Sequence, residues 1–443
     1  MMQMAEFMQD YWVGLSATSQ DIARLVALLL PAMLVGIAAT RRYRPFGMIG
    51  AMIWRFRWTN ALFVALIAVS VGLGVGLIAQ ERGLRQGSAH AAAKFDLIVS
   101  APGSEIEMLL AAVFLQPTDA PLIEGETYDR IAHHDNVVLA APLAYGDSYR
   151  AAPVIGTTAG FVEHLSGTLA QGRPFSAHGE AVIGARVDLK LGDSFVPAHG
   201  HGDGADHDAH AGHGYTVVGR MARSGSPWDR AILVPVEAVW EVHGLASGHA
   251  PGHEEDIGPP FDPAYFPGTP AVLVRATALW ANYALHSEFT TERTMAFFPG
   301  AVLARLHSLL GDVRQAMSVM AMLTQLLVTA GVLTGLVIVT RLYARRLALM
   351  RALGAPARFV FAVVWGYAAI LIGIGSAIGV TIGFAATRII SAIVTARTDI
   401  DVHASLDWPE FHLVAGFVSL TLLLALLPAF AALRRPVIAD LRT

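Results

Sequence analysis

The stretch from Ala61 to Ala79, ALFVALIAVSVGLGVGLIA, decides the fold class of this 443-residue chain. It carries no charge and is interrupted only by Ser70. A helix of about 20 apolar residues crosses the roughly 30 Å hydrocarbon core of a lipid bilayer. We therefore interpret residues 61–79 as a membrane-spanning helix.

The composition of the whole chain agrees with this interpretation. Hydrophobic residues make up 54% and charged residues only 15%, against about 25% charged residues in soluble domains. The chain has no cysteine, which excludes disulfide scaffolds, iron–sulfur clusters, thiolate zinc sites and cysteine catalysis. Its only lysines, Lys94 and Lys190, do not close a glycine-rich phosphate loop. If ATP is used, another polypeptide hydrolyses it.

Further apolar stretches at 318–340, 359–387 and 411–433 also have the length of a span. A shorter stretch at 25–40 contains Pro31. It fits a fifth span, an interfacial helix or the core of a signal peptide. We favour a span because no basic region precedes it and three arginines follow it where a cleavage site would lie.

The distribution of charge predicts the orientation of these spans. Segments 41–57 and 341–358 each contain five arginines and no acid, whereas residues 80–315 hold 27 acidic and 15 basic residues. Positive charge is retained on the cytoplasmic side of membranes. We therefore expect both arginine clusters and the C-terminal tail in the cytoplasm, and the long middle segment outside.

The middle segment is expected to form an α+β domain. It alternates short strand-like runs with turns rich in Gly and Pro. The strand-like runs are 95–100, 136–141, 215–218, 231–235 and 271–274, and helical stretches occur at 105–114 and 301–310.

The fold class predicted from the sequence is a polytopic α-helical membrane protein with five transmembrane helices and a large α+β domain between the second and third. Its expected segments are an N-terminal extra helix (1–40), a cytoplasmic basic, amphipathic segment (41–58), a span (59–80), the outer domain (81–315), a span (316–341), a cytoplasmic arginine-rich segment (342–358), a span (359–387), an outer loop (388–410), a span (411–433) and a cytoplasmic tail (434–443).

Glycines recur at helical spacing within the predicted spans. In lipid, small residues four apart let helix backbones approach closely. We therefore predict helix-packing faces at these positions. They are Gly72 and Gly76, Gly331 and Gly335, and the triple Gly375, Gly379 and Gly383.

A histidine-rich segment at 198–214 interrupts the outer domain. Imidazole and carboxylate ligands at this density suit zinc, copper or nickel. The competing interpretation is a solvated turn extension that binds metal only adventitiously. The candidate ligands are His199, His201, Asp203, His207, His210 and His213.

The run RRLALMRALGAPAR at 345–358, directly before a span, carries a family resemblance. It resembles the short cytoplasmic helix that docks on the ATPase in ABC transporter permeases of the FtsX, LolC/LolE and MacB type. Family members usually have an acidic residue within this run, where Arg346 stands here. The residues that the resemblance assigns to ATPase coupling are Arg346, Met350, Arg351, Ala352, Leu353, Gly354, Ala355 and Arg358.

The resemblance implies a non-catalytic permease subunit in a bacterial inner membrane, with a MacB-like periplasmic domain and four helices in the family core. It also implies that 41–58 is an elbow helix and 342–358 a coupling helix. By mechanotransmission it would couple ATP hydrolysis to motion of that domain, exporting or extracting a lipophilic, lipoprotein or peptide substrate. ATP and magnesium would be bound by the partner ATPase. Further expected partners are a second permease copy or paralogue, the lipid bilayer, and a periplasmic adaptor, lipoprotein or metal-binding protein. No nucleic-acid partner is expected.

Three alternatives stay open at this point. The histidine-rich segment fits a zinc-linked transport component, with zinc bound at that segment. An FtsX-like protein could instead signal across the membrane to a periplasmic enzyme. A membrane-anchored metalloenzyme is the third alternative, although the sequence offers no catalytic constellation for it.

Overall fold

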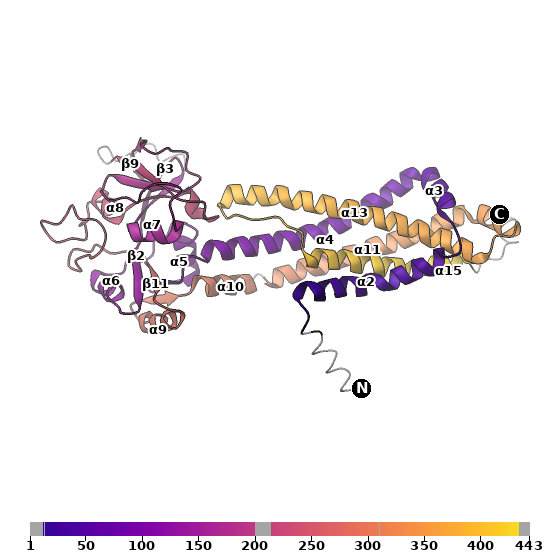
Figure 1. Cartoon of the computed structure of the whole chain (residues 1–443), viewed down its shortest axis with the longest axis horizontal. Coiled ribbons are helices and arrows are strands. Elements are labelled where there is room, and N and C mark those ends of the chain that lie inside the picture. The colour runs from indigo at the N-terminus through magenta and orange to yellow at the C-terminus, as the bar shows by residue number, and fades with distance from the viewer. Residues whose placement is uncertain (1–11, 13, 200–213, 310, 434–443) are drawn as a thin grey trace, which may run out of the picture. The chain divides into compact units, whose positions relative to one another are not determined.

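The computed structural model describes residues 12, 14–199, 214–309 and 311–433 (Figure 1). These residues fall into two compact units, which we treat separately. The helical unit comprises the described residues of 1–83, 312–391 and 404–443. The sheet unit comprises those of 84–311 and 392–403.

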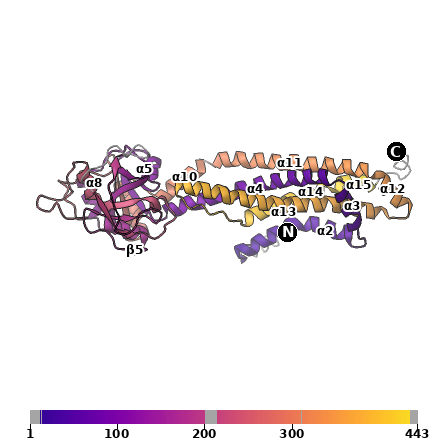
Figure 2. The ribbon, with the colours of Figure 1, turned by 90° about the horizontal axis from the view of Figure 1, so that it is seen from above.

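Helices supply nearly all of the helical unit. They are α2 (Ala17–Thr40), α3 (Phe46–Arg55), α4 (Arg57–Ala92), α11 (Gly311–Leu342), α12 (Ala344–Ala352), α13 (Ala357–Thr398), α14 (Trp408–Leu424) and α15 (Leu426–Leu433). The last turns of α4 and α13 count with the sheet unit. Within the helical unit, the long helices lie side by side in both views (Figures 1 and 2).

Five segments of the described chain are long and apolar enough to cross a membrane. They are Ala17–Thr40, Arg57–Ala92, Ser318–Leu342, Ala357–Thr398 and Trp408–Ala431. The five predicted helices are thereby confirmed as helices of spanning length. Pro31 does not end the first one, because neighbouring helices and local adjustments satisfy the backbone groups that a proline frees in such helices.

Polar caps begin two of these helices. The Ser16 hydroxyl accepts a hydrogen bond from the Ser19 backbone N–H, 3.3 Å away, ahead of α2. Asp407 and Glu410 form a reciprocal capping box ahead of α14. Such caps satisfy N–H groups that have no partner within the helix.

The sheet unit contains two sheets. Its strands are β1 (Leu97–Ser100), β2 (Val137–Pro142), β3 (Ala144–Tyr149), β4 (Ala152–Thr157), β5 (Gln171–Gly172), β6 (Glu180–Ile183), β7 (Ser194–Phe195), β8 (Ala198–His199), β9 (Tyr215–Arg220), β10 (Ile232–Pro235), β11 (Ala271–Ala276) and β12 (Met295–Phe297). The smaller sheet is antiparallel in the order β12-β1-β11-β2. The larger sheet has the order β5-β9-β6-β10-β4-β3-β8, and β7 pairs with β9.

Strand β10 lies at the centre of the larger sheet. It pairs in parallel with β4, where Ile232 is opposite Val154, and antiparallel with β6, where Ile232 is opposite Ile183. All four residues of β10 are buried. A short strand that is buried on both faces reads as a continuous apolar run, which is how the run 231–235 appears in the sequence.

Helices cover these sheets. They are α5 (Glu105–Ala112), α6 (Gly125–Ala132), α7 (Ala159–Ser166), the 3-10 turn η2 (Pro227–Arg230), α8 (Val236–Val242), α9 (Leu279–Phe289) and α10 (Pro299–Leu309). Trp228 of η2 is fully buried, and its ring meets that of Phe161 in α7 edge to face at 5.3 Å. The mixture of helices and strands confirms the α+β class of the middle segment.

Two predicted boundaries are wrong. The expected loop at 388–410 is helical as far as Thr398, and α4 continues to Ala92, beyond the predicted end of its span at 80. The predictions stopped at the first polar residues, because they used apolar length to find the spans. A helix does not have to end where its apolar stretch ends, and the residues after 387 still include good helix formers.

Candidate coupling site

Helix α12 ends in a well-defined turn. The Gly354 N–H donates to the Arg351 carbonyl at 3.1 Å, and the Ala355 N–H donates to the Met350 carbonyl at 2.9 Å. These two bonds make a Schellman motif, in which the residue after the cap adopts a left-handed conformation. Gly354 takes that position with a φ of +102°. Pro356 follows, where it cannot continue the preceding helix.

One face of α12 is buried and the other is open. Leu347 and Ala348 are buried, and Tyr343 just before the helix is buried against the ring of Phe56, 5.4 Å away. By contrast, Leu353 is 88% exposed at the end of the helix. The arrangement fixes α12 to the helical unit by its inner face and leaves an apolar side chain at its tip.

Arginines lie at both ends of α12, with Arg345 and Arg346 in its first turn and Arg358 at the start of α13. Arg345, Arg346 and Arg358 are exposed, and the Arg346 guanidinium lies over the Tyr343 ring at 5.2 Å. Cation–π contacts of this kind orient a guanidinium. The open face of α12 and its terminal turn therefore offer positive charge together with the exposed side chains of Leu349 and Leu353, which suits a partner protein surface.

The residues assigned to coupling by resemblance all lie in this region. Arg346, Met350, Arg351 and Ala352 are in α12, Leu353 to Ala355 form its terminal turn, and Arg358 is in the first turn of α13. They are therefore brought together by a single helix and the turn that follows it.

The glycine triple of α13 lies against α4. A methyl group on Gly379 would come within 2.8 Å of the Ala68 carbonyl oxygen, and one on Gly383 within 2.7 Å of the Gly72 carbonyl oxygen. A methyl on Gly375 would meet the Ile67 Cβ at 2.7 Å. Two of these three neighbours are backbone oxygens, which cannot rotate away. The backbones of α4 and α13 thus approach closely along this face.

The other predicted packing glycines differ in how tightly they are enclosed. A methyl on Gly72 would lie 3.1 Å from the Gly379 carbonyl oxygen, whereas one on Gly76 would lie 3.7 Å from Thr387 Oγ1. On α11, a methyl on Gly335 would overlap the ring of Phe63, but one on Gly331 would only reach Leu66 at 3.9 Å. The sequence spacing therefore identifies helices that pack against others, but it does not indicate how tightly each glycine is enclosed.

The predicted metal site falls mostly outside the described residues. His201, Asp203, His207, His210 and His213 all lie there. His199 ends β8, in backbone register with Asp147 of β3. Among the residues that the structure does describe, no group of three His, Asp or Glu side chains could hold a metal ion.

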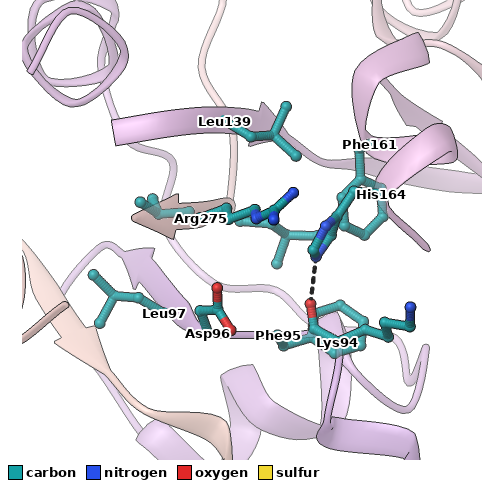
Figure 3. Close-up of a pocket in the computed structure, with 10 residues that line it drawn as sticks. Lys94, Phe95, Asp96, Leu97, Leu139, Phe161, His164 and Arg275 are labelled. Atoms are coloured by element: carbon teal, nitrogen blue, oxygen red, sulfur yellow. Dashed lines mark hydrogen bonds between the residues drawn. The ribbon is translucent and has the colours of Figure 1, made fainter. Parts of the chain in front are cut away.

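A small pocket opens in the sheet unit between β1, β11 and α7 (Figure 3). Lys94, Asp96 and Arg275 line it, and His164 on its wall makes a 2.8 Å hydrogen bond with the Lys94 carbonyl. Its cavity volume is about 10 Å³, which is room for about one water molecule. The pocket is too small for a lipid or a peptide.

A buried ion pair in the helical unit escaped the sequence analysis. Arg82 Nη1 of α4 lies 2.9 Å from Glu410 of α14, and Arg82 Nη2 donates to the Ser405 carbonyl at 2.6 Å. Only 9% of the Arg82 side chain and 2% of the Glu410 side chain are exposed. The only sequence signal is that each residue lies near one end of an apolar stretch, and many flanking charges share that property.

A comparison with protein families gives one match. Residues 318–437 match the family model of the FtsX-like permease C-terminal domain. This range contains α12, α13 and α14, and therefore also the Schellman turn at Gly354 and the glycine triple of α13. No curated protein gives a significant match to the chain. This match to an FtsX-like permease C-terminal domain supports the resemblance of the chain to ABC transporter permeases of the FtsX, LolC/LolE and MacB type.

Proposed function

We propose that this chain is the permease subunit that couples ATP hydrolysis by a separate ATPase to motion of its sheet unit. The exposed tip of α12 is the observation that carries this proposal. It presents Leu353 at the end of a helix that also exposes Arg345 and Arg346 and whose other face is buried in the helical unit. A partner that closes on ATP could push on such a helix without unfolding it.

The route from α12 into the membrane helices supports the same proposal. The Schellman turn at Gly354 joins α12 to α13, which packs against α4 through backbone-lined contacts. Close-packed interfaces shift as units rather than deforming continuously. Displacement of α12 would therefore move α13 and α4 together.

The substrate class follows from the same reasoning. The predicted spans 61–79 and 359–387 contain no Asp, Glu, Lys, Arg or His, and membrane pathways for ions or protons normally use such groups. We infer that the work is done outside the bilayer, on a lipophilic, lipoprotein or peptide substrate. The sheet unit would then be periplasmic, with both arginine clusters and the C-terminus cytoplasmic in a bacterial inner membrane. A second permease copy or paralogue would complete the transporter.

Single-cysteine labelling tests the orientation. Because the chain has no cysteine, a Leu353→Cys variant carries one thiol. We expect a membrane-impermeant maleimide to label it in inverted vesicles and not in intact spheroplasts. A Leu245→Cys variant, on an exposed site of the sheet unit, should give the opposite result. Labelling of Cys at 353 from outside would refute the proposal.

ATPase binding tests the coupling itself. We expect Leu353→Asp to reduce capture of the partner ATPase at least tenfold. The substitution would place a charged carboxylate where the bound ATPase is proposed to cover an apolar side chain. Leu245→Asp is the matched control and should leave capture unchanged. ATP hydrolysis by the purified chain alone would contradict the assignment of catalysis to a partner.

The zinc-linked alternative stays a prediction. Its support is the histidine and aspartate content of 198–214. If the segment serves transport of zinc, a variant with His201, His207, His210 and His213 replaced by Ser should lose zinc binding by calorimetry and impair zinc-dependent growth. Unchanged growth together with normal protein levels would reduce this segment to an adventitious metal binder.

A further inference from the structure

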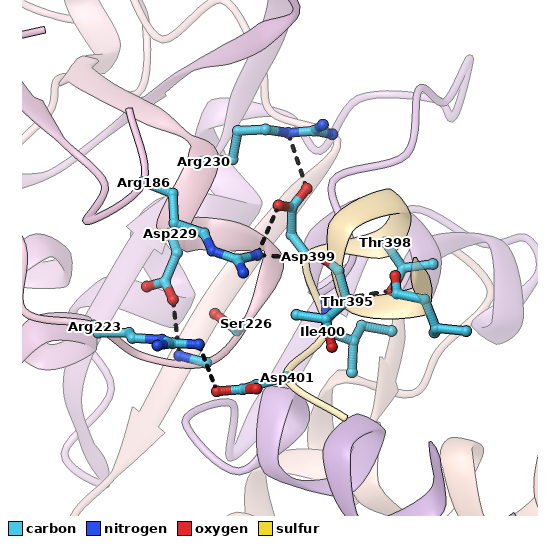
Figure 4. Close-up of polar contacts among 12 residues, drawn as sticks. Arg186, Arg223, Ser226, Asp229, Arg230, Thr395, Thr398, Asp399, Ile400 and Asp401 are labelled. Atoms are coloured by element: carbon cyan, nitrogen blue, oxygen red, sulfur yellow. Dashed lines mark hydrogen bonds and ion pairs between the residues drawn. The ribbon is translucent and has the colours of Figure 1, made fainter. Parts of the chain in front are cut away.

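The C-terminal end of α13 is held in the sheet unit by two arginines (Figure 4). Asp399, the first residue after the helix, lies 3.1 Å from Arg186 Nη1 through Oδ1 and 3.0 Å from Arg230 Nε through Oδ2. Only 7% of its side chain is exposed. Both carboxylate oxygens are therefore used, each by a different guanidinium. We call Asp399, Arg186 and Arg230 the Asp399 clamp.

The helix end itself adds to this attraction. Arg186 Nη1 also lies 3.4 Å from the Thr395 carbonyl in the last turn of α13. The last carbonyls of a helix have no partner within the helix and carry partial negative charge, so a cation is favourable there. The arginines thus meet the negative end of α13 together with the carboxylate.

The backbone around Asp399 is held in an uncommon conformation. Asp399 has a φ of +56° and its N–H donates to the Thr395 carbonyl at 3.0 Å. A left-handed conformation is costly for a residue other than glycine, although Asp tolerates it better than most, and it persists where the surroundings fix it. The Val402 N–H bonds Thr395 Oγ1 at 3.0 Å, which fixes the chain on the other side.

The two arginines come from a rigid part of the sheet unit. Arg186 follows β6 and Arg230 precedes β10, and these two strands are neighbours in the larger sheet. The Arg186 N–H donates to the Asp229 carbonyl at 2.7 Å. The Asp229 carboxylate is buried and accepts from the Ser224 and Gly225 N–H groups at 2.7 and 2.9 Å. The arginine backbones are therefore tied to each other and to the centre of the sheet.

A second contact next to the clamp holds the connection beyond α13. Asp401 pairs with Arg223 at 2.9 Å, and its N–H donates to the Gly225 carbonyl at 3.0 Å. Arg223 is 59% exposed, and exposed ion pairs contribute little. We therefore assign the main role to the less exposed Asp399 clamp.

We propose that Asp399 is the positioning residue through which α13 transmits displacement to the central strands of the larger sheet. This inference rests on the proposed function and names the point at which the displacement enters the sheet. The coupling turn at Gly354 and the Asp399 clamp are the two ends of one continuous helix, Ala357–Thr398, together with the residues that flank it. An axial or rotational movement of that helix would reach β6 and β10 through Arg186 and Arg230.

The test uses the full chain with its partner ATPase in lipid nanodiscs. Trp58→Cys and Leu279→Cys, both at well exposed positions, each carry a spin label. The distance between the two labels is measured with and without ATP. We expect Asp399→Asn to reduce the ATP-driven change at least threefold while ATP hydrolysis continues. Asp399→Glu, which keeps the charge, should preserve most of the change.

Glu105→Gln is the matched control. It breaks an ion pair of the sheet unit, with Arg305 at 2.9 Å, that involves no residue of α13, and it should leave the change intact. If Asp399→Asn fails to fold, as judged by thermal unfolding, Arg230→Gln tests the same clamp from its more exposed side.

The outcomes separate the two proposals. A full ATP-driven change in folded Asp399→Asn and Arg230→Gln would overturn the role of the clamp and leave the proposed function standing. If the unmodified protein shows no ATP-driven change, the proposed function fails and the role of the clamp fails with it. If these variants lose ATP hydrolysis in proportion to their loss of the distance change, the clamp has a purely structural role. That result would also overturn its proposed role in transmitting displacement.

Discussion

Helix α4 meets α13 and α14 in two chemically different ways. Its contact with α13 includes a row of glycines whose missing side chains let the backbones approach closely, as at Gly379 and Gly383. Its contact with α14 includes the buried ion pair between Arg82 and Glu410. The glycine part of the first contact depends on shape, and hydrogen bonds from the Tyr367 hydroxyl to Asn60 Oδ1 and from the Ser391 hydroxyl to Gln80 Oε1 accompany it. The second depends on the pairing of two buried charges, and removing either one destabilises the fold because it leaves the other charge buried and unpaired.

The largest effect is expected from breaking the ion pair. Arg82→Met would leave the Glu410 carboxylate buried without its partner, and removing one member of a buried pair costs about 3–5 kcal/mol. Thermal unfolding in detergent would measure the loss. Arg82→Met combined with Glu410→Gln should recover most of the stability, because no charge stays buried and glutamine can retain the capping box. No recovery in the double variant would contradict this account.

A smaller loss is expected from filling the glycine contact. Gly379→Ala would place a methyl 2.8 Å from the Ala68 carbonyl oxygen, and overpacking of this kind costs about 1–3 kcal/mol. Gly373→Ala is the control on the same helix, since a methyl there meets nothing within 4 Å. It should be neutral or slightly stabilising because alanine has the higher helix propensity. Equal unfolding temperatures for the two variants would show that the α4–α13 contact is looser than described.

Within the glycine contact, Gly76→Ala should have little effect. Its methyl would lie 3.7 Å from Thr387 Oγ1, which is an ordinary van der Waals separation. We expect its unfolding free energy to fall within about 0.5 kcal/mol of the unmodified protein, the range typical of substitutions that create no clash. A loss as large as that of Gly379→Ala would mean that the spacing, rather than the enclosure, determines the cost.

The smallest effect is expected from an ion pair at the surface of the sheet unit. Arg173 Nη1 donates to Glu180 Oε2 at 2.8 Å, and this hydrogen bond is the main reason that the pKa of Glu180 is lowered to about 2. A carboxyl group whose pKa is lower in the folded state stabilises the fold at a pH above its unfolded-state pKa. This stabilisation is lost as the pH falls through the folded-state pKa. Because Arg173 is 53% exposed, water screens the pair and its contribution to stability should be small.

Thermal unfolding against pH checks this last prediction. Glu180→Gln should unfold at a slightly lower temperature than the unmodified protein at pH 7. The difference should shrink as the pH falls from about 4.5 toward about 2. A difference that stays constant through this window would exclude the carboxylate charge as its cause.

The same comparison explains what the sequence could predict. Glycines four residues apart are a local pattern, so Gly375, Gly379 and Gly383 could be assigned to a packing face without knowing their neighbour. The coupling turn was equally local, because a glycine followed by Pro356 marks a helix end. The five spans and the α+β class followed from apolar length and alternation in the same way.

The pairs that span long sequence separations could not be predicted. Arg82 and Glu410 are ordinary flanking charges until the fold brings α4 and α14 together. Asp399 lay in a segment expected to be a loop, because Arg388 ended the apolar stretch that defined the preceding span. Nothing in the sequence indicated that the helix continues to Thr398 and delivers this carboxylate to Arg186 and Arg230.

The Schellman turn at Gly354 makes the junction of α12 and α13 a corner rather than a hinge. Two backbone hydrogen bonds and the ring of Pro356 leave the main chain there few free torsions. A rotation applied to α12 would therefore be passed on to α13 instead of being absorbed by bending at the turn. If the proposed function is correct, even a small rotation of α12 would reach α13, because the turn between the two helices has few torsions that could absorb it.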